Sequence, residues 1–271
     1  MGGLAVFVKK LALNLGLRAI SVLGPAGYFR LATAFAIELP NIVKQRDLKP
    51  LDKRMGRRPI TCRVGGHRFI FDAQFSDEHF DDGTYTFGVI RELYIRNCYL
   101  RDEAAQLPER LGAVVDLGAN RGVFSMMMAP RANKVIAVEV LPEHVEGILH
   151  TAKLNGFDHI AVESAFIGAG GNYDARKTRT ITMNELLDHH SIDRISLLKM
   201  DIEGSEYELF QHPDWLDRVD VLCMEIHPEW GRVQDVLDTL TAKGFRHTAR
   251  THTFAKVTDP QQSEFVYARR I

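Results

Sequence analysis

Acidic and imidazole side chains gather in two short stretches of the 271-residue sequence. Asp201 and Glu203 directly follow an apolar run in "LLKMDIEGSEYELF", and Glu225 and His227 end another in "VLCMEIHPEW". Crowded carboxylates repel one another unless a positive group is near, so the cluster is a candidate site. An imidazole titrates near neutral pH and suits the role of general base. We therefore expect proton-transfer chemistry here; a histidine that simply points outward before Pro228 is the competing interpretation.

A glycine-containing loop, "DLGANRG", occupies residues 116–122 between an apolar run and a helical stretch. Gly118 and Gly122 would let the backbone pass close to a ligand, and the free N–H groups that begin the helix suit a negative group. The GKS or GKT of a phosphate-binding loop is absent, and Asn120 and Val123 stand where a dinucleotide loop needs glycines. An NAD-dependent oxidoreductase is thus disfavoured, while a glycine turn that only packs strand against helix stays an alternative.

Glu139 lies near the end of the next apolar run, "VIAVEV", 23 residues after Asp116. A carboxylate at this place in an α/β protein can accept hydrogen bonds from ribose hydroxyls. The loop and Glu139 together favour a ligand with a ribose and a negative group but without a pyrophosphate. S-adenosylmethionine has an adenosine, a methionine carboxylate and a sulfonium that an acidic neighbourhood tolerates, so it is the ligand we expect.

The elements that must position these residues alternate between apolar runs and helical stretches. "AVVDLG", "KVIAVEV", "ISLLKMD" and "VDVLCMEI" lack period-2 alternation, as expected for strands buried on both faces. Each is followed by a turn and a helical stretch, which predicts the doubly wound α/β class. "HIAVESAFIG" fits a further strand, and "FRHTAR" and "EFVYARR" can pair antiparallel at the sheet edge. The candidate residues fall at the carboxyl ends of the strands, where such sheets bind ligands.

Three parts of the chain differ in composition. Residues 1–59 form an apolar, basic extension that we expect to be helical. Residues 60–110 begin with a β-hairpin around Gly-Gly in "ITCRVGGHRFIFDAQF" and continue with helical spacing in "DGTYTFGVIRELYIRNCYLRDEAAQLPERL". Residues 111–271 form the ligand-binding α/β domain.

The charge of the chain is unevenly distributed. Residues 1–63 carry twelve Lys and Arg against three Asp and Glu, a balance of +9, so the remainder sums to −10. Arg18 and Arg30 keep every uncharged run short of the roughly 18 residues of a membrane span, so we expect no transmembrane helix and no signal peptide. Helices packed on the main domain are the favoured interpretation, and peripheral contact with an anionic membrane is the alternative.

One further partner class and the compartment follow from composition. Nucleic-acid binding is not expected, because no aromatic pattern is interleaved with the basic residues. Cys62, Cys98 and Cys223 form no CxxC motif, which suits a reducing cytosol. We expect a cytoplasmic protein, with a place at the inner face of the membrane as the alternative.

Taken together, "VVDLGANRGVFS", "VIAVEVLPEHVEGILHTAKLNG", "ITMNELLDHHSIDRISLLKMDIEGSEYELF" and "VLCMEIHP" resemble the FkbM-like family of S-adenosylmethionine-dependent methyltransferases in order and spacing, over roughly residues 110–270. The resemblance implies a class I methyltransferase domain over residues 111–271, with a seven-stranded, mostly parallel Rossmann-like sheet and helices on both faces. It also implies methyl transfer, usually to oxygen, on sugars or secondary metabolites.

The resemblance assigns roles by position. Glu139 would hold the ribose, and Asp201 would lie beside the methionine and the transferred methyl group. The residues that complete the cofactor site would be Asp116, Gly118, Ala119, Asn120 and Gly122 at the methionine end and Ala165 and Phe166 near adenine.

Glu206 and Glu208 favour a helix N-terminus that Ser205 or a preceding acid would cap. His189 and His190 fit a solvated loop.

Our first hypothesis is an O-methyltransferase that acts on a hydroxyl of a saccharide, glycolipid or secondary metabolite, with His227, Glu203 and Glu225 as catalytic residues. These three and Asp201 could instead gather a magnesium ion, although their spacing does not demand one. The alternative, from another class, is a membrane-associated binding or scaffold protein that keeps the fold without turnover. The basic, apolar N-terminus motivates that alternative.

Overall fold

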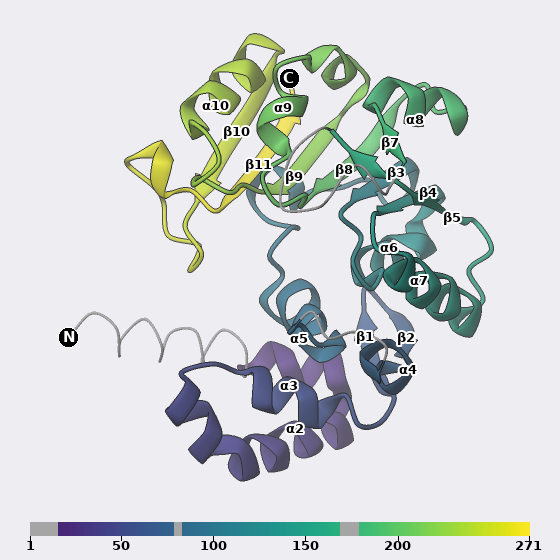
Figure 1. Ribbon diagram of the computed structural model, residues 1–271, viewed down its shortest axis with the longest axis vertical. Helices are drawn as coiled ribbons and strands as arrows, with labels where there is room; N and C mark the ends of the chain where they lie inside the picture. The colour runs from purple at the N-terminus through teal and green to yellow at the C-terminus, as the bar shows by residue number, and fades with distance from the viewer. Residues whose placement is uncertain (1–15, 79–82, 169–178) are drawn as a thin grey trace.

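A computed structural model describes residues 16–78, 83–168 and 179–271. Its centre is a seven-stranded sheet with the order β10-β11-β9-β8-β3-β4-β5 (Figure 1). Neighbouring strands from β9 to β5 run parallel, and β11 is antiparallel to both β9 and β10. The predicted mostly parallel sheet and its antiparallel edge are confirmed. The bounds are β3 Leu111–Leu117, β4 Ala132–Glu139, β5 Ile160–Ser164, β8 Ile195–Met200, β9 Val221–Glu225, β10 Phe245–Arg250 and β11 Phe265–Arg270.

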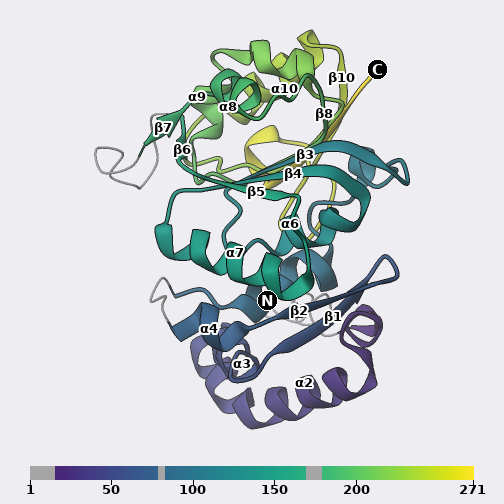
Figure 2. The ribbon, with the colours of Figure 1, turned by 90° about the vertical axis from the view of Figure 1, so that its right-hand side faces the viewer.

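Helices cover both faces of the sheet, as Figure 2 shows. In β3, Val114 packs into one hydrophobic cluster and the adjacent Val115 into another, because successive side chains of a strand point to opposite faces. The first cluster contains Phe124 and Ile148 of the helices α6 and α7, and the second contains Val236 of α10. The helices of this part are α6 Val123–Met128, α7 Pro142–Asn155, α8 Met183–His189, α9 Glu206–Leu209 and α10 Val233–Ala242, with 3-10 turns η3 Ala129–Arg131, η5 Pro213–Arg218 and η6 Pro260–Gln262.

Two predicted elements are shorter than expected. The strand predicted in "HIAVESAFIG" ends at Ser164, and β6 Phe166–Ile167 pairs separately with β7 Thr180–Ile181. The helix predicted through residues 83–110 consists of α5 Thr86–Ile90 and a π-helical segment, η1 Arg91–Arg96. It ends at Asn97, whose φ of 56° is left-handed, and only a 3-10 turn, η2 Asp102–Ala104, follows. Backbone reversal at Asn97 therefore overrides the helical spacing.

The N-terminal part packs below the sheet on the face that carries α6 and α7 (Figures 1 and 2). It contains α2 Leu17–Gln45, α3 Lys49–Met55, the hairpin β1 Ile60–Val64 and β2 His67–Phe71, and α4 Ala73–Glu78. Gly65 and Gly66 both have positive φ in the hairpin turn, so the predicted hairpin is confirmed. Apolar side chains of these elements belong to the same cluster as those of α6 and α7.

The helix α2 corrects one expectation. By length and composition it is long and apolar enough to cross a membrane, with a mean hydropathy of 1.3 over 18 residues. The sequence prediction of no such helix considered uncharged runs only, but the helix continues through Arg30. Core helices of soluble proteins pass the same criterion, and Gly24, with a φ of 69°, kinks this one.

Candidate functional site

Two cavities meet at the carboxyl ends of the parallel strands. The wide cavity, of about 330 Å³, extends from the strand ends to α3 and α5. The narrow cavity, of about 80 Å³, lies over the ends of β4 and β6. Four residues line both cavities: Gly118, Asn120, Asp201 and Glu203. A ligand in one cavity therefore lies next to a ligand in the other.

The glycine loop brings the ends of β3 and β8 together. Gly118 has a φ of 68°, and a Cβ on it would lie 1.7 Å from the backbone oxygen of Asp201. The Asp201 N–H donates to the Leu117 carbonyl at 3.1 Å. Only glycine fits this approach, so the backbone by itself requires Gly118. Ala119, as predicted for the loop, lines the wide cavity.

Gly122 and Asp116 have structural roles that the sequence prediction did not assign. A Cβ on Gly122 would lie 3.1 Å from Ile148, and Gly122 lines neither cavity, so its left-handed φ serves the start of α6. Asp116 is fully buried and also lines neither cavity. Its carboxylate accepts hydrogen bonds from the Ser125 N–H at 3.1 Å and hydroxyl at 2.7 Å. Both residues thus support the fold of the loop, and their contact with the cofactor stays a prediction.

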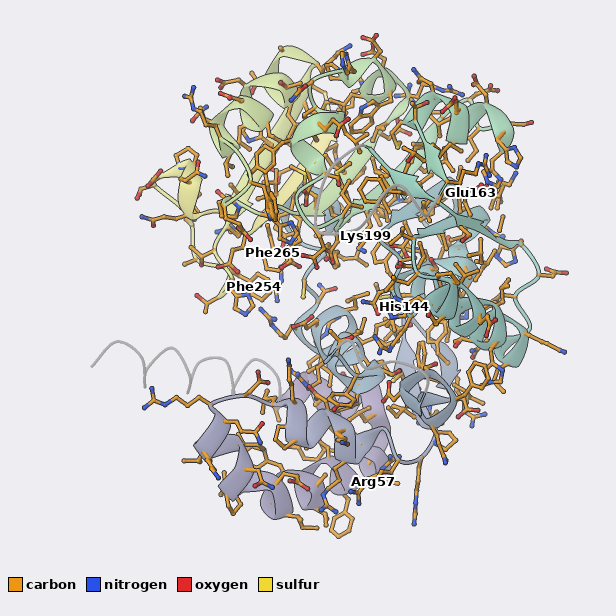
Figure 3. All side chains as sticks on the ribbon, in the orientation of Figure 1. Arg57, His144, Glu163, Lys199, Phe254 and Phe265 are labelled. Carbon is orange, nitrogen blue, oxygen red and sulfur yellow. The ribbon has the colours of Figure 1, made fainter. Side chains whose placement is uncertain are left out.

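Lys199 is a site residue that the sequence analysis missed. Its buried Nζ donates to the Gly118 carbonyl at 2.7 Å and lies 3.3 Å from the Asp116 carboxylate and 3.9 Å from that of Asp201. Burial lowers the pKa of Lys199, but the two carboxylates outweigh burial and raise it. A fixed positive charge thus lies under the glycine loop, at the centre of the view in Figure 3. A lysine inside the apolar run "LLKMD" was the signal for it.

Glu139 ends β4 and lines the narrow cavity. Its carboxylate accepts hydrogen bonds from the backbone N–H groups of Asn120 at 2.7 Å, Val140 at 2.8 Å and Leu141 at 3.0 Å. Burial raises the pKa of Glu139, but the hydrogen bonds from His144 and the backbone outweigh burial and lower it. The ionised carboxylate fixes the glycine loop and keeps lone pairs for a further donor. Ala165 and Phe166 form an apolar part of the same cavity.

The predicted acidic residues meet around one tyrosine. The Tyr99 hydroxyl lies 2.9 Å from Asp201 Oδ2 and 3.3 Å from Glu225 Oε2. Burial and the charges of Asp201 and Glu92 raise the pKa of Glu225 well above its usual range. Its protonated form is therefore favoured more than in an exposed glutamate, so Glu225 suits a hydrogen-bond donor better than a base. Tyr99 was not predicted, since an aromatic residue in a helical stretch gave no signal.

His227 is held by a buried carboxylate. Its Nδ1 lies 2.7 Å from Oε1 of Glu206, which is fully buried, and its Nε2 lies 3.5 Å from Glu203. Burial lowers the pKa of His227, but the hydrogen bond and charge of Glu206, with Asp201 and Glu203, outweigh burial and raise it to about 9. The pairing excludes a histidine that simply points outward, because both ring nitrogens face carboxylates and the ring lines the wide cavity.

The interpretation of Glu206 as only a favourable residue at a helix N-terminus was incomplete. Glu206 opens α9, and Ser205 makes no side-chain capping hydrogen bond there. The short helix turns Glu206 inward beneath His227, which lies beyond the end of β9. Spacing along the chain could not reveal this pair, since the two residues come from different elements.

Within the described residues, two groups of side chains have the spacing of metal ligands. Asp201, Glu203 and His227 offer ligand atoms within 4.8 Å of one another. Magnesium prefers a near-octahedral set of oxygen ligands, so one imidazole and two carboxylates do not select it, and magnesium stays a prediction. His189 and His190 lie beside Glu163 in the second group. The prediction of a solvated pair was wrong for His190, whose Nε2 lies 3.0 Å from Glu163 because the end of α8 turns it onto β5.

The far wall of the wide cavity comes from residues outside the α/β domain. Leu48, directly before α3, and Asp52 of α3 line this wall, and Asp52 forms a buried two-point ion pair with Arg91 at 2.7 and 2.6 Å. Arg121 of the glycine loop donates to the Thr84 hydroxyl at 2.7 Å and the Asn120 side chain at 2.9 Å. The N-terminal part is thus built into the site and tied to the glycine loop.

Comparison with known proteins supports the resemblance drawn from the sequence. Residues 155–247 match the family model of the methyltransferase FkbM domain. A tRNA/tmRNA (uracil-C(5))-methyltransferase of Nautilia profundicola is 27% identical over 122 residues, which cover 42% of this chain and 33% of that protein. An uncharacterized protein of Methanocaldococcus jannaschii is 27% identical over 95 residues, which cover 35% of this chain and 36% of that protein. The chain therefore spans about a third of the length of these two relatives.

Among solved structures, an rRNA methylase from Streptococcus thermophilus has a TM-score of 0.43 and 14% identity, covering 61% of this chain and 89% of that one. A likeness at this level carries over neither an activity nor a ligand. The family prediction is confirmed for the matched segment, which contains the acidic cluster, Glu206 and His227.

Proposed function

We propose that this protein is an S-adenosylmethionine-dependent O-methyltransferase. Its acceptor would be a hydroxyl of a saccharide, glycolipid or secondary metabolite, and residues 155–247 match the FkbM methyltransferase domain. One observation carries the proposal. The Glu206–His227 pair lies at the wide cavity, beside Glu203, which also lines the narrow cavity. A base for the acceptor is therefore available where the two cavities meet, in the neutral form of His227, whose fraction grows as the pH rises toward its pKa of about 9.

The residues of the narrow cavity fit the cofactor. Ala165 and Phe166 provide an apolar surface for adenine, and the ionised Glu139 can accept hydrogen bonds from ribose. The close approach at Gly118 leaves no room for a side chain and opens the backbone to the methionine end. Asp201, between the cavities, offers a carboxylate to a positive centre. S-adenosylmethionine supplies a methyl group on such a centre, a sulfonium.

His227 would accept the proton of the acceptor hydroxyl at Nε2, because Nδ1 is occupied by Glu206. As the oxygen–carbon bond forms, the carbon–sulfur bond breaks and its electron pair stays on sulfur. The carboxylate of Glu206 fixes the tautomer and stabilises the imidazolium that results, the role of an orienting acid in a catalytic triad. Glu225 and Tyr99, whose pKa values are both raised, would orient Asp201 and the acceptor by hydrogen bonds.

The walls of the wide cavity favour a hydrophilic acceptor. Charged side chains line it on both sides, and Tyr85, Tyr99 and Phe265 add aromatic surface. This combination suits a molecule with many hydroxyl groups and apolar ring faces. A nucleic-acid acceptor, which the name of the Nautilia relative raises, is opposed by the acidic cluster and by the charge of −10 over residues 64–271.

The location proposed with this function is the cytoplasm, where the free thiols of Cys62, Cys98 and Cys223 would stay reduced. Contact of residues 1–63 with an anionic membrane is part of the same proposal. A protein of this fold that binds lipid without turnover is the alternative candidate, favoured by the exposed apolar side chains of α2.

Calorimetry and a transfer assay test the proposal in sequence. The wild type should bind S-adenosylmethionine, and Glu139→Ala should bind it at least about tenfold more weakly, since the change removes the ribose acceptor and the anchor of the loop. Glu143→Ala, on the exposed side of α7, serves as the matched control. Binding of NADH but not of S-adenosylmethionine would refute the proposal.

Transfer of labelled methyl groups is then measured with saccharide, glycolipid and tRNA fractions. We expect labelled saccharide or glycolipid from the wild type and a loss of about a hundredfold or more in His227→Gln, with cofactor binding kept. Labelled tRNA alone would overturn the acceptor class. Cofactor binding with no labelled product from any fraction would favour the alternative without turnover.

A further inference from the structure

The face of α2 that points away from the protein is apolar. Phe29, Ile37 and Val43 are all exposed, Phe29 at 74% and Val43 at 59% of the maximum. At about 100° per residue they lie on one side of the helix, opposite the buried Leu31 and Ile42. Of the ten large hydrophobic residues that are exposed in the described part of the chain, six belong to α2. Such a concentration marks an interaction surface.

The charge beside this face indicates the partner. Residues 44–58, at the end of α2 and through α3, contain seven Lys and Arg against two Asp. Figure 3 places Arg57 at the end of the molecule where α2 lies. An apolar helix face with a basic border is the pattern that enters the headgroup region of an anionic membrane. We propose that the outward face of α2 binds in the plane of an anionic lipid membrane.

The same helix is held too firmly to the protein to cross the bilayer. Its inner face packs against α3 and β1. Arg18 donates to the Tyr94 carbonyl at 2.8 Å, and Arg30 donates to the Pro59 carbonyl at 3.1 Å. Crossing would break these bonds and expose the core between α2 and the hairpin to lipid or water. The helix therefore lies on the membrane with its other face still packed.

The position of α3 connects the membrane surface with the site. Leu48 and Asp52 line the wide cavity, and Arg54, two residues after Asp52, pairs with Glu38 of α2 at 2.6 Å. A molecule bound through α2 thus holds the wall of the wide cavity close to the lipid. This step rests on the proposed function: it selects, among hydrophilic acceptors, a saccharide attached to a membrane lipid.

Vesicle flotation with the full chain tests the surface. We expect the wild type to float with vesicles of equal phosphatidylcholine and phosphatidylglycerol, weakly with phosphatidylcholine alone, and less at high salt. Phe29→Glu with Val43→Glu should weaken partition at least about tenfold, because each change replaces an inserted apolar side chain by a charge. Leu149→Glu, also an exposed position but on α7, is the control and should float like the wild type. Since all three positions are exposed, thermal unfolding should show that the variants are folded.

Several results would overturn the surface assignment. Equal loss in Leu149→Glu, or no flotation with either vesicle, would exclude the α2 face. A wild-type dimer that becomes a monomer in Phe29→Glu with Val43→Glu, without flotation, would show that a second copy covers the face. Resistance to an alkaline carbonate wash would show a spanning helix. Calorimetry with S-adenosylmethionine on the same samples separates the two proposals. A wild type that floats but does not bind S-adenosylmethionine would contradict the proposed function and leave the membrane surface supported.

Discussion

Replacement of Glu206 by Gln tests the central pair of the site most directly. The change keeps the shape of the side chain and removes the charge that lies 2.7 Å from His227 Nδ1. Because the hydrogen bond and charge of Glu206 are the largest effects that raise the pKa of His227 from 6.5 to about 9, the pKa should fall toward 6.5 in the variant. The general base is the neutral imidazole, so the rising limb of the methyl-transfer rate with pH should move to lower pH.

The same pair should contribute to stability in a defined pH range. Since the folded-state pKa of His227 lies above its unfolded value, the contribution is fully present below pH 6.5 and is lost as the pH rises through about 9. The difference between the two pKa values corresponds to about 3 kcal/mol of unfolding free energy. Because solvent at the cavity screens the pair, we expect it to contribute about 2 kcal/mol. Glu206→Gln should therefore unfold more easily than the wild type at pH 6 and nearly as easily at a pH above 9.

NMR titration of the His227 ring, assigned with His227→Gln, measures the pKa without need of an acceptor. Denaturant unfolding at several pH values measures what the pair contributes to the free energy of unfolding. Glu208→Gln, the same change two residues further along α9, is the matched control and should leave the titration unchanged. If His227 titrates at the same pH in the wild type and in Glu206→Gln, or if Glu208→Gln shifts it as much, the assignment of the pair is refuted.

Three further predictions concern the frame of the site and its metal dependence. Gly118→Ala should lower the free energy of unfolding by more than about 2 kcal/mol and abolish cofactor binding, because the added Cβ would lie 1.7 Å from the Asp201 oxygen. Gly156→Ala, at a residue with a similar φ but open space around it, should lower it by only about 1 kcal/mol. Equal losses in the two variants would contradict the close approach at Gly118. Lys199→Met should lower the free energy of unfolding by about 3 to 5 kcal/mol in denaturant, because it leaves the carboxylate of Asp116 buried without its cation. A loss below about 1 kcal/mol would contradict the role of Lys199 as the cation that stabilises Asp116. EDTA should leave methyl transfer unchanged, because an imidazole accepts the proton; activity lost with EDTA and restored by magnesium would instead support the predicted metal site.

The sequence by itself determined the sheet and the location of the site. Apolar runs such as "ISLLKMD" are typical of strands buried on both faces, and their alternation with helical stretches predicted that most strands are parallel. Because parallel strands end at the same edge, Gly118, Glu139, Asp201 and His227 could be assigned to one site before any coordinates. Spacing that specifies a turn or a strand end is local information, and the sequence carries it directly.

Only the tertiary structure decided which side chains face the cavities and which support them. Asp116 stands in the glycine motif but turns inward to Ser125 and Lys199, whereas Glu206 stands in a helix start and turns inward to His227. Each of these pairs joins different elements, so its geometry depends on how strands and helices pack, and periodicity along the chain contains no such information. The same reason explains why α3, far from the glycine loop in sequence, became a wall of the wide cavity.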